Sequence, residues 1–151
     1  MNVRILIVDD EEEFTTQLAE RLSLRGYYVS TCFSGEEAVE TVKGYNYDVV
    51  ILDVLMSGID GVEALKQLKE INPLLEIIML TGNATVESAI EGMKLGAFDY
   101  LMKPTKTDEL IGKVNKAYAR KAEQEERIRQ AKVNEIISSP RSVFKDDKDD
   151  N

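Results

Sequence analysis

The sequence predicts an α/β fold in which a parallel sheet of five strands is covered by helices on both faces. Short apolar runs alternate five times with amphipathic segments along the chain. Continuous apolar runs are typical of strands buried on both faces, and the amphipathic segments carry apolar residues at helical spacing. Strands and helices that alternate in this way join into a parallel sheet through right-handed crossovers.

The first two strand–helix units lie near the N-terminus. The β-branched run Val3–Val8 predicts the first strand, and Gly26 is expected to end the helix that follows. Tyr27–Thr31 predicts the second strand. The segment Ser34–Glu37 is a capping box, in which the serine caps a helix and the glutamate three residues later reaches back to the backbone. This second helix should end at Gly44. The apolar positions of the first helix are Phe14, Leu18 and Leu22.

The third and fourth units contain the most apolar strand. Asp48–Asp53 is that run, and its composition predicts a central strand. The helix after it should end before Pro73, and Glu76–Leu80 predicts the fourth strand. A helix is expected over Thr85–Leu95, ended by Gly96. The apolar positions of the third helix are Val62, Leu65 and Leu68. The inward residues of the fourth helix are predicted to be Val86, Ala89, Ile90 and Met93.

The fifth unit ends in a helix that is longer than its apolar face. Phe98–Met102 predicts a short strand, and Thr107 or Thr105 can cap the last helix. Strong helix formers continue to Glu135, although the apolar residues thin out after Tyr118. We therefore expect a domain over residues 1–120, a helical extension over 121–137 and a disordered tail over 138–151. The apolar positions of the last helix are Leu110, Ile111, Val114 and Ala117.

Composition excludes several classes of function. The chain has 151 residues and a net charge of −9, which argues against a domain built to grip nucleic acid or anionic lipid. It has no histidine, so histidine-dependent catalysis and histidine zinc sites are excluded, and a single cysteine, Cys32, is expected in the core. Met79 and Met93 are also expected as core residues. No segment approaches the roughly 18 apolar residues of a membrane span, and we expect neither a span nor a signal peptide.

Polar side chains gather at the predicted carboxyl ends of four strands. Asp9 and Asp10 follow the first strand, Asp53 ends the third, Thr81 follows the fourth and Lys103 follows the fifth. In an open parallel sheet these ends meet at one edge, where ligands bind. A single Asp after a strand is most often a turn or capping residue, but five such residues at four strand ends indicate a shared site.

The chemistry of this predicted edge favours a hard cation. Three clustered carboxylates repel one another unless a cation offsets their charge, and oxygen ligands without histidine or cysteine favour Mg²⁺. A carboxylate beside Mg²⁺ and Lys103 is a plausible nucleophile toward a phosphoryl group. Thr81 is placed to donate a hydrogen bond to a phosphoryl oxygen.

Four motifs carry a resemblance to the response-regulator receiver domain of two-component signalling. They are LIVDD at 6–10, VVILDVLMSGIDG at 49–61, MLTGNA at 79–84 and GAFDYLMKP at 96–104, in the order found in that family. The resemblance covers roughly residues 1–120. It implies a flavodoxin-like, doubly wound sheet in the strand order 2-1-3-4-5 with five helices, the last one extended here.

The resemblance also implies which residues bind the metal. Asp53 is implied to be the phosphoacceptor, with Mg²⁺ as the cofactor. Asp10 and Asp53 are implied to bind Mg²⁺ directly, together with the backbone carbonyl of Leu55, whereas Asp9 holds metal-bound water.

Further residues match the phosphoryl contacts and the switch of the family. Thr81 and Lys103 are implied to contact the phosphoryl group, and Tyr100 matches the aromatic residue that turns inward when Thr81 moves. The peptide bond between Lys103 and Pro104 is implied to be cis. One position departs from the family pattern, and two others are expected to affect the lifetime of the phosphorylated state. Ser57 stands where the family often has proline, which should loosen the loop after Asp53, and Leu55 and Asn83 flank the path of the attacking water in the family.

The function implied is a phosphorylation switch in the bacterial cytoplasm. A sensor histidine kinase or a phosphotransfer protein would supply the phosphoryl group, and the domain would catalyse only its own phosphorylation and dephosphorylation. A phosphorylation-dependent homodimer is expected through the fourth helix, fifth strand and fifth helix, where Lys94, Asp99 and Lys113 offer charges. No direct contact with nucleic acid or membrane is expected.

Three alternatives remain open at this stage. The chain is either a stand-alone receiver or the receiver part of a longer transcriptional regulator. A Mg²⁺-dependent phosphohydrolase of the haloacid-dehalogenase-like type also uses an aspartyl nucleophile, but it needs a second Asp where Leu55 stands, and a cap domain. A flavin binder would need a phosphate loop after the first strand, where the run Asp9–Glu13 would repel a flavin phosphate.

Overall fold

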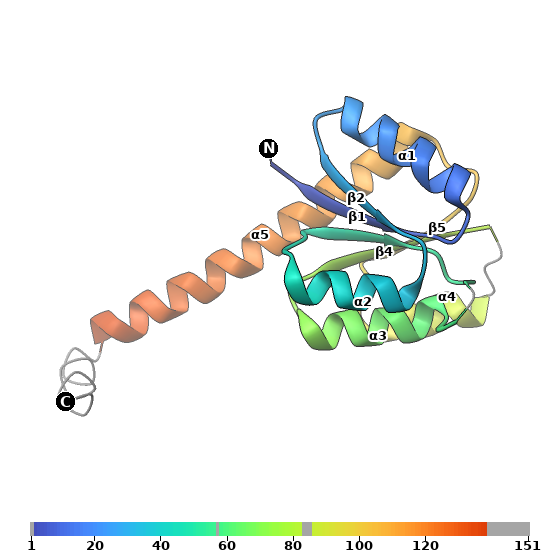
Figure 1. The fold of residues 1–151 in the computed structure, drawn as a ribbon. Coiled ribbons are helices and arrows are strands. Elements are labelled where there is room, and N and C mark those ends of the chain that lie inside the picture. Colours follow the sequence, from blue (N-terminus) through green and yellow to red (C-terminus); the bar gives the residue numbers. More distant parts are fainter. Residues whose placement is uncertain (1, 57, 83–85, 139–151) are drawn as a thin grey trace. The chain divides into compact units, whose positions relative to one another are not determined.

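Five parallel strands form one sheet in the order β2-β1-β3-β4-β5, as the computed structural model of the chain shows (Figure 1). The structure describes residues 2–56, 58–82 and 86–138. The strands are β1 Arg4–Val8, β2 Tyr28–Cys32, β3 Val49–Leu52, β4 Glu76–Thr81 and β5 Asp99–Met102. The helices are α1 Glu12–Leu24, α2 Gly35–Gly44, α3 Gly61–Ile71, α4 Val86–Lys94 and α5 Thr107–Ser138. The predicted fold class and strand order are confirmed, and each strand begins and ends within one residue of its predicted bound.

The chain divides into two units, at residues 1–121 and 122–151, and the sheet lies wholly in the first. The described part of the second unit is the helical segment 122–138. Ser138, the first residue of the predicted tail, is the last residue of α5, and the rest of that tail lies outside the described residues. No described helix is long and apolar enough to cross a membrane.

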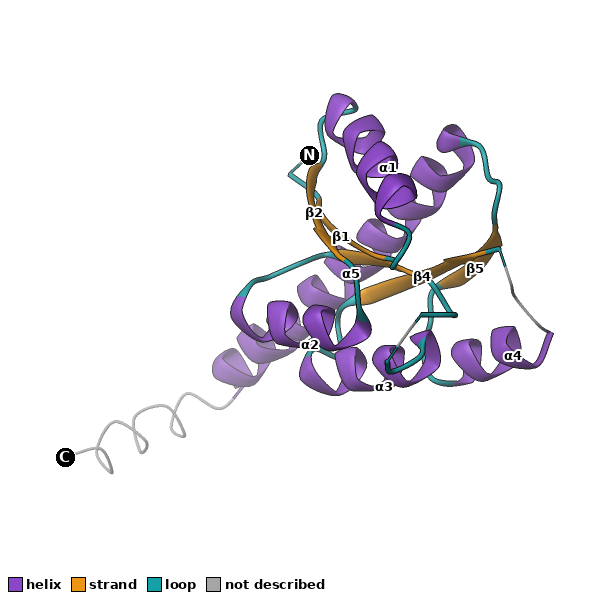
Figure 2. Ribbon diagram, turned by 45° about the vertical axis from the view of Figure 1, so that its right-hand side comes forward, coloured by secondary structure: helices purple, strands orange, loops and turns teal. Residues whose placement is uncertain are grey.

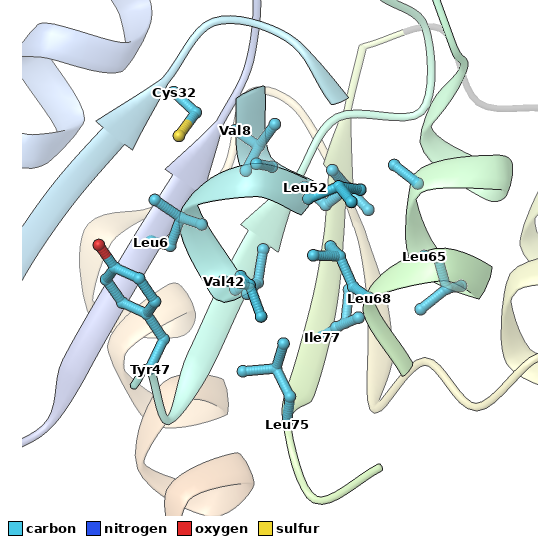
Figure 3. Packing of buried hydrophobic residues seen from close by; sticks show 14 of the residues in the cluster. Leu6, Val8, Cys32, Val42, Tyr47, Leu52, Leu65, Leu68, Leu75 and Ile77 are labelled. Carbon is cyan, nitrogen blue, oxygen red and sulfur yellow. The ribbon is translucent and has the colours of Figure 1, made fainter. Parts of the chain in front are cut away.

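Helices cover both faces of the sheet (Figure 2), and an apolar cluster fills the space between helices and sheet on each face. On one face, β-strand residues pack against Leu18 and Leu22 of α1 and against Leu110, Val114 and Ala117 of α5. On the other face they pack against α2 and α3, where Leu6, Leu52 and Ile77 of the strands meet Val42, Leu65 and Leu68 (Figure 3). Cys32 and Met79 belong to this second cluster, which confirms that both are core residues.

The predicted inward face of α4 is wrong. Val86, Ile90 and Met93 are 76%, 50% and 46% exposed, and so Met93 is not a core residue. The buried residue of this helix is Gly92, where an added Cβ would lie only 2.3 Å from the sulfur of Met79. The helix therefore approaches the sheet through a glycine, and this close approach turns the large apolar side chains outward. Periodicity alone located the apolar stripe but not the side on which the helix packs.

Helix starts follow local sequence signals. Ser34 accepts a hydrogen bond from the Glu37 backbone N–H at 3.1 Å, and the Glu37 side chain accepts one from the Phe33 backbone at 3.2 Å, which confirms the capping box. Asp60, which was not predicted as a cap, accepts from the Glu63 backbone at 2.9 Å and starts α3. The predicted start of α4 at Thr85 lies outside the described residues.

An ion-pair network lies at the opposite end of the strands from the polar edge. Glu76, the first residue of β4, is only 3% exposed and pairs through both carboxylate oxygens with the guanidinium of Arg120. The Lys69 ammonium lies 3.9 Å from the same carboxylate. Arg120 also stacks over the ring of Phe98, 4.6 Å from its centroid. Through these contacts, Arg120 of α5 binds to the first residue of β4.

Replacing Arg120 by Ala is expected to lower the free energy of unfolding by about 2 kcal/mol, because among the described residues the buried Glu76 carboxylate keeps only the more distant Lys69 as an ion-pair partner. Denaturant unfolding followed by circular dichroism measures this change. Arg129→Ala is the matched control, since its pair with Glu126 is exposed and should contribute little to stability. Equal midpoints for the two variants would show that the Glu76 network does not stabilise the fold.

Candidate functional site

Parallel pairing brings three carboxylates together at the carboxyl edge of the sheet. Val8 of β1 pairs with Leu52 of β3, so the residues that follow each strand lie side by side. The Asp53 backbone N–H donates to Val8 O at 2.9 Å. Asp9, Asp10 and Asp53 each offer a carboxylate oxygen, and these oxygens lie within 4.8 Å of one another. Asp9 and Asp53 are buried, whereas Asp10 is exposed.

Lys103 extends from the end of β5 into this cluster. Its backbone N–H donates to Thr81 O at 2.9 Å, and its peptide bond to Pro104 is cis, as the resemblance implied. The ammonium lies 2.6 Å from Asp9 Oδ2 and 4.0 Å from Asp53 Oδ2. Only 13% of the Lys103 side chain is exposed, so the pairing with Asp9 is poorly screened by solvent.

Two residues of the first helical turn also contact Lys103. The Phe14 ring lies under the ammonium, with its centroid 4.0 Å from Nζ, and Glu11 Oε1 lies 3.4 Å from the same nitrogen. Both were missed, because Phe14 was assigned only to the helical core stripe and Glu11 was considered only as part of the acidic run Asp9–Glu13. Neither contact leaves a sequence signal, since each depends on where a lysine about 90 positions later places its ammonium.

The pKa values of Asp53 and Lys103 are both raised, which disfavours the ionised form of Asp53 and favours the ionised form of Lys103. Burial raises the pKa of the Asp53 carboxyl above its ordinary value, hydrogen bonding from Thr81 opposes this, and the charge of Asp9 reinforces it. Burial alone would lower the pKa of Lys103, but its hydrogen bond to Asp9 and the surrounding carboxylates outweigh burial and raise it. Lys103 is therefore held in its charged form, while ionised Asp53 is disfavoured.

The donor set fits a hard cation. Asp53 Oδ1 is buried and has no hydrogen-bond partner within the described residues, so one oxygen in the cluster is left without compensation. The negative charge of the three carboxylates exceeds the positive charge of the Lys103 ammonium beside them. The atoms that these carboxylates offer to a metal are all oxygens. Mg²⁺ is the ion that best suits such a site, with Asp9, Asp10 and Asp53 supplying the carboxylates.

Thr81 and Tyr100 lie on neighbouring strands beside the cluster. Thr81 ends β4 and is fully buried, and Met79 of the same strand pairs with Tyr100 of β5. The Tyr100 ring packs against the buried cluster on the α2–α3 face, and its hydroxyl is buried without a hydrogen-bond partner among the described residues. Of the two residues predicted as the switch, Thr81 is hydrogen-bonded to Asp53, and Tyr100 lies two register positions away from Thr81 on the neighbouring strand.

The remaining predicted site positions have mixed outcomes. The Leu55 side chain is 52% exposed, and the Leu55 backbone is hydrogen-bonded to the Asp53 carboxyl. Ser57, which was expected to loosen the loop, and Asn83, which was expected beside the water path, lie outside the described residues.

Comparison with known proteins identifies the type of domain. The family model of the response regulator receiver domain matches residues 5–115. Over 118 residues the chain is 40% identical to the transcriptional regulatory protein ZraR of Escherichia coli, which covers 78% of this chain and 27% of that protein. It is 36% identical over 147 residues to the alkaline phosphatase synthesis transcriptional regulatory protein PhoP of Bacillus subtilis, covering 97% of this chain and 55% of PhoP.

Solved structures agree with this match. A response regulator receiver domain protein from Clostridium thermocellum superposes with a TM-score of 0.75 at 35% identity, covering 80% of this chain and 97% of that one. NtrX from Brucella abortus superposes with a TM-score of 0.78 at 30% identity, covering 83% of this chain but 29% of NtrX. The chain therefore spans only about a quarter of the length of ZraR and of NtrX.

Proposed function

The chain belongs to the response regulator receiver family, a family of signalling domains, and within it we propose that Asp53 accepts a phosphoryl group in a Mg²⁺-dependent reaction. The observation that carries this proposal is the environment of Asp53. Its carboxylate is buried, has one oxygen without a hydrogen-bond partner among the described residues, and lies beside two further carboxylates and the Lys103 ammonium.

The donor fits the chemistry of the site. A phosphorylated histidine of a sensor kinase or phosphotransfer protein offers a phosphorus atom to an Asp53 oxygen. The new O–P bond forms as the N–P bond breaks, and the released imidazole keeps the electron pair and takes a proton from solvent. The 151 residues contain no histidine, so the phosphorylated histidine lies outside them.

Each neighbouring residue has a defined part in this proposal. Asp10, Asp53 and the Leu55 carbonyl would hold Mg²⁺ directly and Asp9 would hold it through water, and the metal would supply positive charge against the phosphoryl oxygens. The Lys103 ammonium also offsets the negative charge of the phosphoryl oxygens, and the Thr81 hydroxyl donates a hydrogen bond to one of these oxygens. In this account the domain catalyses only its own phosphorylation and dephosphorylation.

The experiment that tests the proposal is uptake of phosphate from a small acyl-phosphate donor. Intact-mass spectrometry should show one added phosphoryl group when Mg²⁺ is present, and none when the metal is removed by EDTA. The adduct should be stable in acid and labile in base, as an acyl phosphate is. Uptake that persists undiminished in EDTA would contradict the proposed role of the carboxylate cluster.

Partners of the switch are proposed from the exposed face of α4 and β5. Val86, Ile90 and Met93 are exposed on α4, and Met102 of β5 is 49% exposed, so this face presents large apolar side chains to solvent. Of the charges expected to pair between two copies, Lys113 already pairs with Asp99 of its own chain at 2.7 Å. A dimer on this face would therefore rest more on apolar contact than on that pair.

We expect the protein to be mostly monomeric, and to shift toward a dimer when beryllofluoride and Mg²⁺ mimic the phosphorylated state. Phosphate must favour one arrangement of Thr81 and Tyr100, and a second copy must bind that arrangement better. Light scattering measures the shift. Ile90→Glu should abolish it, whereas Leu24→Glu, at an 81% exposed position on α1, should not. If the mass stays the same with and without the analogue, this face does not mediate a dimer.

The relatives point to a transcriptional output. ZraR and PhoP are named as transcriptional regulatory proteins, and both extend beyond the part that matches this chain. We propose that this receiver likewise controls transcription through an output domain, attached or separate.

A further inference from the structure

The segment between β3 and α3 carries the Leu55 carbonyl, which the proposed function assigns to the metal. This segment, residues 54–60, contains no proline, and its Gly58 adopts a left-handed backbone conformation with φ +83°. Its two ends are joined to each other, since Gly61 N–H donates to Val54 O at 2.7 Å, and Asp60 caps α3. Near the start of the segment, the Leu55 backbone is hydrogen-bonded to the Asp53 carboxyl. Gly58 and Ile59 are restrained by another element.

The start of α2 supplies that restraint. Glu36 Oε1 accepts a hydrogen bond from the Ile59 backbone N–H at 2.6 Å. The same carboxylate lies over Gly58, where an added Cβ would be 2.5 Å from Glu36 Oε1. The Ile59 side chain in turn lies over Gly35, where an added Cβ would be 2.6 Å from Ile59 Cγ1. A glycine on each side thus lets the loop and the helix approach more closely than other residues would allow.

We propose that Glu36 is a positioning residue, which fixes the loop after Asp53 so that the Leu55 carbonyl faces the metal. The proposal rests on the proposed function, because it assigns a role toward the same Mg²⁺ site. Glu36 accepts the hydrogen bond from Ile59 through one side-chain oxygen, a role that the amide oxygen of glutamine can also fill. In agreement, the hydrogen bond from Ile59 lowers the pKa of Glu36 below its ordinary value.

If Glu36 only stabilises α2, its substitution should have different effects. An acidic residue in the first turn of a helix stabilises that helix through the dipole, wherever its side chain points. In that case its removal would weaken α2 but leave Mg²⁺ affinity unchanged. A positioning role requires the acceptor atom rather than the charge, so glutamine should replace glutamate.

The test compares Glu36→Ala and Glu36→Gln with Glu40→Ala as the matched control. Glu40 lies one turn later in the same helix, is also exposed, and among the described residues its side chain pairs only with Lys43. In the metal-free protein, amide hydrogen exchange at Ile59 should speed up about fivefold or more in Glu36→Ala. Mg²⁺ titration followed by NMR should show about fivefold weaker binding in the same variant. Glu36→Gln and Glu40→Ala should stay within about twofold of the parent in both measurements.

The other outcomes overturn the proposal. Faster exchange at Ile59 with unchanged Mg²⁺ affinity would show that the contact exists but positions nothing. Unchanged exchange would show that the contact does not hold the loop. Equal losses in Glu36→Ala and Glu36→Gln would assign the effect to charge. Failure of the proposed function is distinguishable, because the parent protein itself would then bind no Mg²⁺.

Discussion

Replacing Asp53 by Asn is expected to abolish phosphoryl uptake completely. An amide oxygen is too weak a nucleophile to displace the leaving group of an acyl phosphate, and no other carboxylate in the cluster has the same position beside Lys103 and Thr81. Intact-mass spectrometry after incubation with the donor and Mg²⁺ measures the loss. Asp108→Asn is the control, because that carboxylate is 85% exposed and lies on α5, away from the cluster. Labelling of Asp53→Asn at the parent level would exclude Asp53 as the acceptor.

The same substitution should also change how stability depends on pH in the metal-free protein. The pKa of Asp53 is raised in the folded state, chiefly by burial, so folding is favoured when this group is protonated. This contribution is fully present below the unfolded pKa and is lost as pH rises through the folded pKa. Because Asn cannot ionise, Asp53→Asn should be more stable than the parent at neutral pH, and this advantage should shrink toward acid pH. Urea unfolding at several pH values in EDTA measures the difference, and a constant difference would contradict the assigned cause.

Replacing Asp10 by Asn is expected to weaken Mg²⁺ binding by about tenfold or more, since a direct carboxylate ligand becomes a neutral amide. Asp9→Asn should weaken it less, because Asp9 is proposed to act through water and already pairs with Lys103 at 2.6 Å. The metal-free Asp10→Asn protein should be no less stable than the parent, since one of three repelling charges is gone. A Mg²⁺ titration of the three proteins tests this order. An unchanged affinity in Asp10→Asn would remove that residue from the metal site.

The convergence of polar residues at the sheet edge could be predicted because it follows from topology. Once five strands run parallel, the residues after β1, β3, β4 and β5 must share an edge, whatever the side chains between them. Asp9, Asp53 and Lys103 accordingly lie together in the structure. Strand bounds were predictable for a similar reason, since fully buried parallel strands leave continuous apolar runs in the sequence.

Features that depend on close packing could not be predicted in this way. The orientation of α4 follows from the approach of Gly92 to Met79, and a glycine in a helix gives no indication of which neighbour it meets. The contacts of Phe14 with Lys103 and of Glu36 with Ile59 join elements whose relative placement is set only by the packed core. The internal pair of Lys113 with Asp99 was missed because two charges on neighbouring elements were considered only for contacts between copies.

The central claim, that Asp53 is the phosphoacceptor, is tested most directly by locating the modified residue chemically. The protein is incubated with the acyl-phosphate donor and Mg²⁺, reduced with borohydride, digested and sequenced by mass spectrometry. Reduction converts a phosphorylated aspartate into homoserine. The account predicts homoserine at position 53 alone, with none in a sample prepared in EDTA. Homoserine at another aspartate, or none at all after full exposure to the donor, would contradict it.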